Sequence, residues 1–425
     1  MNTETLKEVI YTNEQYIKKW KGKIIERENI VFPKSIEKAI ILYGVRRSGK
    51  TFILFNQFLK HVDKAIYIDF EDDRLNNFRM EDFEKLKSAA IELKPHLGSE
   101  KIHYYLDEIQ NVKGFEKFVR RVVERENASV IVSGSLSKIR PEQISTTLRG
   151  RSWSIEILPF SFREYLKTQS IDFENIILIP EQRAILKRSF REFIAWGGFP
   201  EVILAKNEFE KKKILKEYFN AMFFKDLVEK YEMTNITLLE LLLDKLFSSY
   251  STRLSLTSIY KQYKDKMPLS KDSLYDYYKK ILESMLIFEV RKFSESSYKR
   301  ARNPAKIYLV DVGLAKDTTS QNIGKRMENV VFIELKRRGY DLYYFDEKRE
   351  CDFIAVKDKE LTPIQVTYEI NDTNREREIE GIVEACKFLG VKKGLIITYD
   401  EEETFEIHDI EVEIIPIYKW LISLR

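Results

Sequence analysis

The sequence predicts a multidomain α/β protein, and three observations lead to that prediction. The chain has 425 residues, enough for two to four domains with separate cores, and 44% of them are hydrophobic, which is typical of globular protein. In the N-terminal part, short apolar runs alternate with helix-like stretches, the pattern of a parallel sheet covered by helices. Further along, helical periodicity and then new strand-like runs indicate additional domains.

Composition narrows the classes of function. Lys plus Arg number 72 and Asp plus Glu number 68, so a net charge of +4 is too small for a surface that binds nucleic acid throughout. The two cysteines and four histidines have no close spacing, which argues against structural zinc and a disulfide framework. The start lacks a secretory signal pattern and no apolar run could span a membrane, so we expect a cytoplasmic protein without a membrane partner.

We assign residues 1–30 to an N-terminal helical segment and residues 31–158 to a core that begins with an apolar run at 39–43. Directly after that run lies the octapeptide Gly44-Val45-Arg46-Arg47-Ser48-Gly49-Lys50-Thr51. The spacing G-x-x-x-x-G-K-T is that of a phosphate-binding loop, because two glycines let successive N–H groups point at phosphates at the start of a helix. Lys50 is expected to reach the β- and γ-phosphates and Thr51 to bind Mg²⁺. An ordinary glycine turn would need neither residue.

Three further apolar runs of the core lie at residues 65–70, 101–108 and 129–135, and the last two end in polar residues. Because the carboxyl ends of parallel strands meet at one edge of a sheet, these endings should converge beside the loop. Asp107 is then expected on the Mg²⁺ side, and Glu108 is expected to orient and deprotonate the attacking water. A solvated acidic turn is the alternative for this pair.

Three more residues are candidates for the same chemistry. Ser135 could hydrogen-bond the γ-phosphate or the water, and Arg149 and Arg151 could supply positive charge to the transition state. Each has a structural alternative, because a serine at a strand end often caps the next helix and loop arginines often pair with surface acids. The sequence does not say whether the arginines act within one chain or on a neighbouring copy.

The middle of the chain predicts two more parts. Residues 159–235 should form a helical lid, because their apolar residues recur at helical spacing around a turn at Gly197-Gly198-Phe199-Pro200. Residues 236–318 have the order of a winged-helix domain: a helix, a turn, a second helix N-capped by Ser270, and two strand-like runs.

The predicted winged helix leaves two kinds of partner open. Residues on the second helix and between the strands suit contacts with DNA, namely Lys271, Ser273, Tyr275, Lys279, Lys280, Lys299, Arg300 and Arg302. Asp272 and Asp276 on the same helix would repel phosphate, and a winged helix can also dock a protein. Both DNA and protein partners therefore stay open.

Residues 319–425 are predicted to form a small α/β domain. A helix at 323–337 carries Glu328 on its apolar face, and two strand-like runs follow with Asp352 on the first and Gln365 on the second. An acid on an apolar helix face needs a partner.

The chain as a whole resembles archaeal and bacterial AAA+-type P-loop ATPases whose C-terminal domain is similar to a PD-(D/E)xK nuclease. The resemblance is carried by Gly44 to Thr51, residues 105–110, 133–135, 148–151, 158–165 and 196–201. It implies an AAA+-like core that binds ATP with Mg²⁺, and the sequence agrees in lacking an Asn-Lys-x-Asp element that would read guanine.

The resemblance also implies a nuclease-like site at Glu328, Asp352 and Gln365. Active members carry Glu-x-Lys where this chain has Gln365-Val366-Thr367. This departure removes one negative metal ligand and one positive group, so we expect a degenerate site without cleavage.

We therefore expect an ATP-hydrolysing enzyme that couples hydrolysis to rearrangement on DNA or of its partner domains. A nucleotide-dependent signalling switch that binds protein partners is one alternative, and a structure-specific nuclease is another. A homo-oligomer is compatible with each of these functions.

Overall fold

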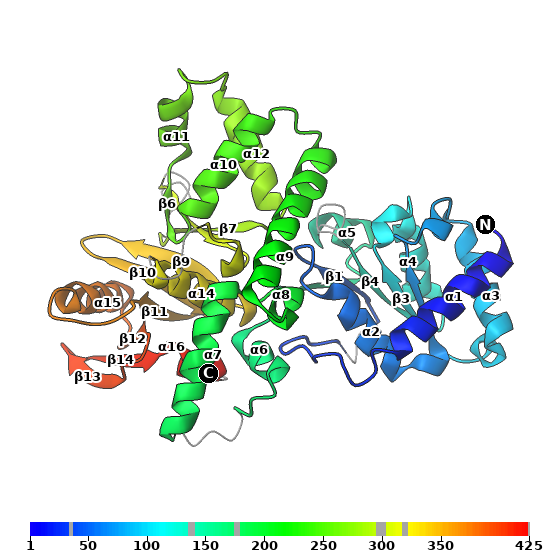
Figure 1. Ribbon diagram of the computed structural model, residues 1–425, viewed down its shortest axis with the longest axis horizontal. Helices are drawn as coiled ribbons and strands as arrows, with labels where there is room; N and C mark the ends of the chain where they lie inside the picture. The colour runs from blue at the N-terminus through cyan, green and yellow to red at the C-terminus, as the bar shows by residue number, and fades with distance from the viewer. Residues whose placement is uncertain (34–36, 135–140, 174–178, 295–302, 317–321, 424–425) are drawn as a thin grey trace. The chain divides into compact units, whose positions relative to one another are not determined.

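The computed structural model describes residues 1–33, 37–134, 141–173, 179–294, 303–316 and 322–423, with the side chains of 141–143 left out. Ser135 and the basic residues Lys299, Arg300 and Arg302 lie outside these ranges. The chain divides into two compact units, Met1–Leu158 and Pro159–Arg425 (Figure 1). Within the described ranges, none of the helices combines the length and apolarity needed to cross a membrane.

The first unit is built on a five-stranded parallel sheet in the order β2-β3-β4-β1-β5, which confirms the predicted α/β core. Its strands are β1 (Ala39–Tyr43), β2 (Ala65–Asp69), β3 (Ile102–Asp107), β4 (Ala128–Ser133) and β5 (Ser152–Glu156). Its helices are α1 (Thr3–Lys18), α2 (Lys50–Lys60), α3 (Asp82–Leu93), α4 (Phe115–Arg125) and α5 (Pro141–Thr147), with short 3₁₀ turns η1 (Val62–Lys64), η2 (Asp73–Leu75), η3 (Pro95–Gly98) and η4 (Ile109–Asn111).

Both faces of this sheet are covered, because its strands are apolar on both sides. Ile41 and Leu42 are neighbours on β1 and are both fully buried, yet they belong to different hydrophobic clusters. Leu6 and Val9 of α1 lie in the same cluster as Ile41. The N-terminal helix, which we assigned to a separate segment at 1–30, is therefore part of the core of the first unit.

The second unit combines helices with one nine-stranded sheet in the order β13-β14-β12-β11-β10-β9-β7-β8-β6. Its strands are β6 (Thr252–Leu254), β7 (Ile287–Lys292), β8 (Ala305–Leu309), β9 (Asp341–Asp346), β10 (Glu350–Lys357), β11 (Glu360–Val366), β12 (Lys393–Thr398), β13 (Glu403–Ile407) and β14 (Ile410–Pro416). Its helical elements are α6 (Phe162–Thr168), α7 (Pro180–Trp196), α8 (Pro200–Leu204), α9 (Glu208–Ala221), the π-helix η5 (Met222–Glu229), α10 (Ile236–Ser248), α11 (Leu256–Tyr263), α12 (Lys271–Glu283), the 3₁₀ turn η6 (Val312–Leu314), α14 (Ile323–Arg337), α15 (Arg375–Leu389) and α16 (Ile417–Ile422).

A parallel pairing joins two regions that the sequence assigns to separate domains. α10, β6, α11, α12, β7 and β8 follow one another along the chain, and β8 pairs antiparallel with β6 and β7. β7 then pairs parallel with β9, through Arg291 opposite Tyr343 and Lys292 opposite Tyr344. The predicted boundary between residues 318 and 319 therefore falls inside one continuous sheet.

The turn predicted at Gly197 and Gly198 is held by a buried carboxylate. Asp311 accepts hydrogen bonds from the backbone N–H groups of Gly198 (2.6 Å) and Gly313 (2.8 Å). Gly197 has φ +78°, and a Cβ there would lie 1.7 Å from an oxygen of Asp311. Only glycine fits this approach, so the turn fixes the end of α7 against the segment that follows β8.

Candidate functional site

The phosphate loop connects β1 to α2 through backbone that requires glycine. Gly44 has φ +144°, and a Cβ on it would lie 2.3 Å from the carbonyl oxygen of Ile157. Gly49 precedes α2 with φ +96°, and no side chain in the described part of the chain caps that helix. The first N–H groups of α2 are thus left for an anion, and the helix dipole adds positive potential there.

Two side chains inside the loop carry polar groups of the kind that bind a phosphate. Lys50 is 6% exposed, and its ammonium donates to the carbonyl oxygens of Gly44 (3.1 Å) and Val45 (3.0 Å). Ser48 is fully buried, and its hydroxyl has no hydrogen-bond partner among the described residues. A buried hydroxyl without a partner is unfavourable, so this loop has hydrogen-bonding capacity that a phosphate oxygen could use.

Asp107, at the end of β3, lies next to the loop threonine. It is 2% exposed and accepts hydrogen bonds from Thr51, from the Tyr67 hydroxyl (3.1 Å) and from the Ser133 hydroxyl. Burial raises the pKa of Asp107, and the neighbouring Glu108 carboxylate raises it further, while the hydrogen bonds oppose the shift. The two residues predicted to bind Mg²⁺ are therefore in direct contact.

A second acid, which the sequence analysis did not single out, adds to this edge of the sheet. Asp69 ends β2 and stands opposite Asp107 in the strand pairing. Burial raises the pKa of Asp69 to about 6, and the charge of Asp107 contributes to that shift. The sequence could have indicated Asp69, because an acid at the carboxyl end of a neighbouring parallel strand must lie close to Asp107.

Glu108 follows Asp107 in an unusual backbone conformation. Its φ is +48°, and its half-buried carboxylate accepts a hydrogen bond from the side-chain amide of Gln110. A positive φ in a glutamate is uncommon and turns the side chain away from the direction that a continuing strand would give it. Glu108 is thus held at the strand end beside Asp107.

The described residues alone do not build a metal centre. No group of three or more His, Cys, Asp or Glu side chains within the described ranges is arranged to hold a metal ion. Mg²⁺ commonly binds through one or two protein ligands together with phosphate oxygens and water. Thr51 and Asp107 fit that pattern.

Arg149 and Arg151 lie near the amino-terminal ends of the strands, at the end of the sheet opposite the phosphate loop. The Arg151 carbonyl oxygen accepts from the Ala39 N–H group (2.9 Å) at the first residue of β1, whereas the phosphate loop follows its last residue. A strand of five residues spans about 16 Å, which is more than an arginine side chain can reach. Arg151 instead contacts Glu124 at 3.3 Å. The backbone of Arg151 therefore lies at the end of β1 opposite the phosphate loop of its own chain.

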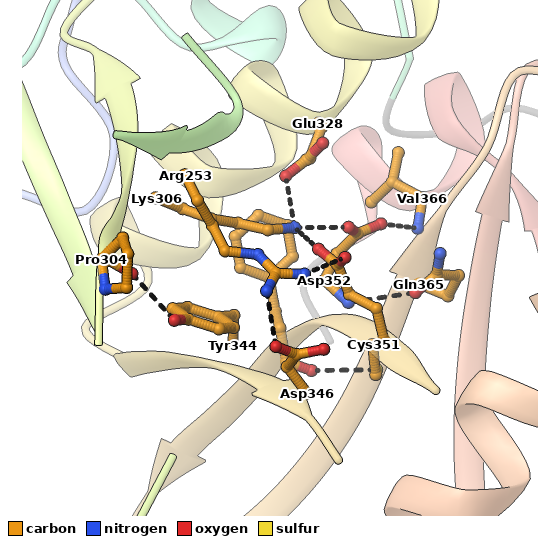
Figure 2. Close-up of polar contacts among 12 residues, drawn as sticks. Arg253, Pro304, Lys306, Glu328, Tyr344, Asp346, Cys351, Asp352, Gln365 and Val366 are labelled. Atoms are coloured by element: carbon orange, nitrogen blue, oxygen red, sulfur yellow. Dashed lines mark hydrogen bonds and ion pairs between the residues drawn. The ribbon is translucent and has the colours of Figure 1, made fainter. Parts of the chain in front are cut away.

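The three residues of the predicted nuclease-like site come together in the second unit (Figure 2). Asp352 on β10 accepts from the backbone N–H of Val366 (3.0 Å), and the Gln365 amide oxygen accepts from the backbone N–H of Asp352 (3.0 Å). The Gln365 amide nitrogen donates to Glu378 (2.6 Å) on α15. Gln365 therefore uses both ends of its amide in protein contacts.

The residue at the centre of this cluster, Lys306, was not among the predicted site residues. Lys306 on β8 is 3% exposed and contacts both Asp352 and Glu328. A lysine directly before the apolar run Ile307-Tyr308-Leu309-Val310 was a visible signal, because a charged group in an apolar strand needs buried partners.

The exposed face of α12 is mixed in charge. Lys271, Ser273 and Lys279 are exposed and Tyr275 is 43% exposed, while Lys280 contacts Asp276 at 2.7 Å. Ser270 caps the helix by accepting from the Ser273 N–H group (2.9 Å). The helix thus presents both signs of charge to solvent.

Comparisons with known proteins divide the chain into three matched regions. Residues 36–166 match the AAA domain family, and residues 187–322 and 323–420 match two families of domains of unknown function. An uncharacterized protein of Methanocaldococcus jannaschii, MJ1544, is 36% identical over 98% of this chain and 95% of its own length. An uncharacterized protein of Haemophilus influenzae is 28% identical over 94% of this chain and 99% of its own length.

Solved structures give weaker likenesses. The Walker-type ATPase PABY2304 of Pyrococcus abyssi matches 68% of this chain and 96% of its own with 14% identity and a TM-score of 0.45. The ORC1 protein of Aeropyrum pernix, solved in complex with DNA, matches 70% of this chain and 88% of its own with 12% identity and a TM-score of 0.27. At these scores the likeness says nothing about what this chain binds.

Proposed function

Because the chain belongs to the same family as protein MJ1544 of Methanocaldococcus jannaschii and carries an AAA domain at residues 36–166, we propose that it binds ATP with Mg²⁺ and hydrolyses it. The observation that supports this most is the contact between Thr51, at the start of α2, and the buried Asp107. A glycine turn without a nucleotide would not need a buried aspartate beside its threonine.

The phosphate loop and the acid beside it would bind the phosphates and the cation of the nucleotide. The N–H groups at the start of α2 bind phosphate oxygens, and Lys50 turns from the carbonyls of Gly44 and Val45 toward the β- and γ-phosphates. Thr51 and Asp107 hold the cation, and the bound Mg²⁺ neutralises charge on the phosphates. Ser135, which lies outside the described residues, is proposed to hydrogen-bond the γ-phosphate or the attacking water.

Glu108 is the proposed general base. Its position after β3, beside Asp107, supports this role, because the γ-phosphate would lie at the same end of the sheet and the carboxylate could there orient and deprotonate a water molecule. The Gln110 amide that it accepts from would keep the carboxylate in place.

Substitution of these two residues separates binding from turnover. We expect Lys50→Ala to lose ATP binding and Glu108→Gln to keep binding while its turnover falls by about 10²-fold or more. ATP affinity and the rate of phosphate release measure the two effects. Lys60→Ala on the same helix and Glu92→Gln on α3 are exposed controls that should behave like wild type. Wild-type turnover by Glu108→Gln would refute Glu108 as the base.

Arg149 and Arg151 are proposed to act on the nucleotide of a neighbouring copy. Both are exposed, and both lie at the sheet edge opposite the phosphate loop of their own chain. Such a role requires a homo-oligomer, because the site would be incomplete in a single chain.

We propose that hydrolysis is coupled to the second unit, with DNA as the first partner to test. The support is the element order of α11, α12, β7 and β8 together with the basic residues at the exposed surface of α12. A protein partner is the alternative, and the acids Asp272 and Asp276 on the same helix favour it.

One experiment distinguishes these partners. The steady-state ATPase rate is measured across protein concentrations with and without duplex, branched and single-stranded DNA. Stimulation by DNA, weakened by salt, supports coupling on DNA. A slow rate that DNA leaves unchanged supports the signalling switch with protein partners. A specific rate that rises with protein concentration supports the oligomer.

A further inference from the structure

A lysine ammonium lies among three carboxylates in the second unit, at the place where the nuclease-like site was predicted (Figure 2). Lys306 comes from β8, whereas Glu350 and Asp352 come from β10 and Glu328 comes from α14. The Lys306 Nζ atom is 2.7 Å from Glu350, 2.8 Å from Asp352 and 3.3 Å from Glu328. Three chain segments thus meet at one positive charge.

The hydrogen-bonding capacity of this ammonium is fully used. An ammonium has three N–H donors, and here three carboxylates surround it. Lys306 is 3% exposed, so water does not compete for these contacts. Burial by itself lowers the pKa of a lysine, but the charges of Asp352 and Glu328 raise the pKa of Lys306 well above its ordinary value. The group therefore stays charged at neutral pH.

The oxygen atoms around Lys306 are of the kind that a hard divalent cation binds, although with the lysine in place they are not arranged among the described residues to hold one. Hard cations bind carboxylate oxygens that converge from separate elements, and Glu328 and Asp352 converge in this way. Other protein groups also contact these carboxylates. Tyr308 donates its hydroxyl to Glu328 (2.6 Å), and the second oxygen of Asp352 accepts from the Val366 backbone. A second cation, Arg253, contacts Glu350 at 2.7 Å.

We propose that Lys306 is a tethered cation that fills a latent divalent-cation site and thereby keeps the nuclease-like cluster free of metal. The ammonium supplies the positive charge that the carboxylates need, and it does so without a bound ion. In the same contacts it fastens β8, in the predicted winged-helix region, to α14 and β10. This inference concerns the second unit alone and does not depend on ATP hydrolysis in the first.

A metal-binding experiment on the full-length chain tests the proposal. Mn²⁺ binding is measured by calorimetry and by electron paramagnetic resonance, without nucleotide, for wild type, Lys306→Met and the double variant Lys306→Met/Asp352→Asn. Methionine keeps much of the length of lysine and removes its charge. We expect Lys306→Met to bind one more Mn²⁺ per chain than wild type, and the double variant to lose that additional ion.

Thermal unfolding gives a second measure of the site. A loss of packing alone would lower the unfolding midpoint of Lys306→Met, but it would not make Mn²⁺ raise that midpoint again. Lys306→Met should unfold at a lower temperature than wild type without metal, and Mn²⁺ should raise its midpoint by several degrees. The double variant should show no such gain. Lys393→Met is the matched control, because Lys393 contacts Glu411 (2.9 Å) and Glu413 (3.2 Å) at the surface, and its loss should create no Mn²⁺ site.

Two results would overturn the proposal. In the first, the wild-type protein binds Mn²⁺ and the Asp352→Asn substitution abolishes that binding. The ammonium of Lys306 would then not exclude the cation. This comparison remains informative if Lys306→Met does not fold. The other is a folded Lys306→Met variant that binds no additional Mn²⁺.

Discussion

Gly44, the first glycine of the loop motif, lies against the backbone of Ile157. Its φ of +144° and the 2.3 Å from a built Cβ to the Ile157 carbonyl oxygen leave no room for a side chain. The contact is with main chain, which cannot rotate away as a side chain could. The first glycine of the loop therefore fixes how the loop leaves β1.

We expect Gly44→Ala to weaken ATP binding at least tenfold, because the loop must shift to relieve the contact. The measurement is titration with a fluorescent ATP analogue. Gly98→Ala is the control, since the nearest atom to its built Cβ is a flexible Ile91 methyl group at 3.9 Å, and it should bind like wild type. Unchanged affinity in Gly44→Ala would mean that this approach does not shape the site.

Asp311 makes the stability of the second unit depend on pH. Burial raises the pKa of Asp311 to about 7, although the N–H groups of Gly198 and Gly313 oppose the shift. The folded state therefore binds a proton more tightly than the unfolded chain, whose aspartate has its ordinary pKa of 3.8. The stabilising contribution is complete below about pH 4 and is lost as the pH rises to about 7.

The difference in unfolding free energy between wild type and Asp311→Asn should fall between about pH 4 and pH 7 and stay level above that range. The expected fall is on the order of 4 kcal/mol. Chemical denaturation of both proteins at several pH values measures it. A difference that does not change with pH would remove Asp311 as the titrating group.

At the scale of elements, an asparagine side chain of α14 joins this helix to β8 by hydrogen bonds to the backbone of the strand, as a neighbouring strand would. Asn329 is fully buried, accepts from the Leu309 N–H group (2.8 Å) and donates to the Leu309 carbonyl oxygen (2.9 Å). One side chain thereby satisfies both backbone groups of a buried residue. Together with Lys306, it makes β8 the point where the helix and the sheet are joined.

Replacement of Asn329 by Ala should lower the free energy of unfolding of the second unit by about 2–4 kcal/mol, because two buried backbone groups lose their partners. Denaturant unfolding measures the change. Asn322→Ala, at the start of the same helix, is the control, since the Asn322 side chain makes no capping hydrogen bond within the described ranges. The control should stay within about 0.5 kcal/mol of wild type. Equal effects of the two substitutions would contradict the role of Asn329.

At the scale of the whole molecule, the position of the arginines makes assembly testable. The Arg151 backbone lies at the end of β1 opposite the phosphate loop and Arg149 lies two residues before it, so the catalytic role that we propose for them calls for a second copy. We expect Arg149→Ala/Arg151→Ala and Lys50→Ala each to lose ATP turnover. A mixture should recover part of it, because the intact loop of one variant can meet the intact arginines of the other.

Turnover of the mixture across mixing ratios measures this recovery. Lys50→Ala mixed with Glu108→Gln is the control, since both changes affect the same side of the site and no intact combination forms. A mixture of the first pair that never exceeds the sum of its parts would contradict action between chains.

Much of the first unit was predictable because its signals are local. The parallel core follows from apolar strands that alternate with helices, and the place of the phosphate loop follows from its spacing between β1 and α2. Asp107 and Glu108 lie at the strand end where the sequence predicts them, and their roles stay a prediction. Asp69 could have been added by the same argument about neighbouring strand ends.

The second unit was less predictable because its defining contacts join distant segments. The parallel pairing of β7 with β9 has no signature in the apolar pattern of either strand, so the sequence suggested a domain boundary where the sheet continues. Lys306 is 46 residues from Asp352, and its role depends on where β8 lies in the sheet. A lone lysine in an apolar strand shows only that a partner is needed.

The sequence by itself determined the nucleotide-binding loop, the acid pair after β3 and the substitution of Gln365-Val366-Thr367 for Glu-x-Lys, because each is a spacing within a few residues. The tertiary structure alone decided that the backbone of Arg151 lies at the end of β1 opposite the phosphate loop and that Lys306 lies among three carboxylates. The physical reason is that strand direction and strand order, which no short stretch of sequence encodes, set which charges meet in space.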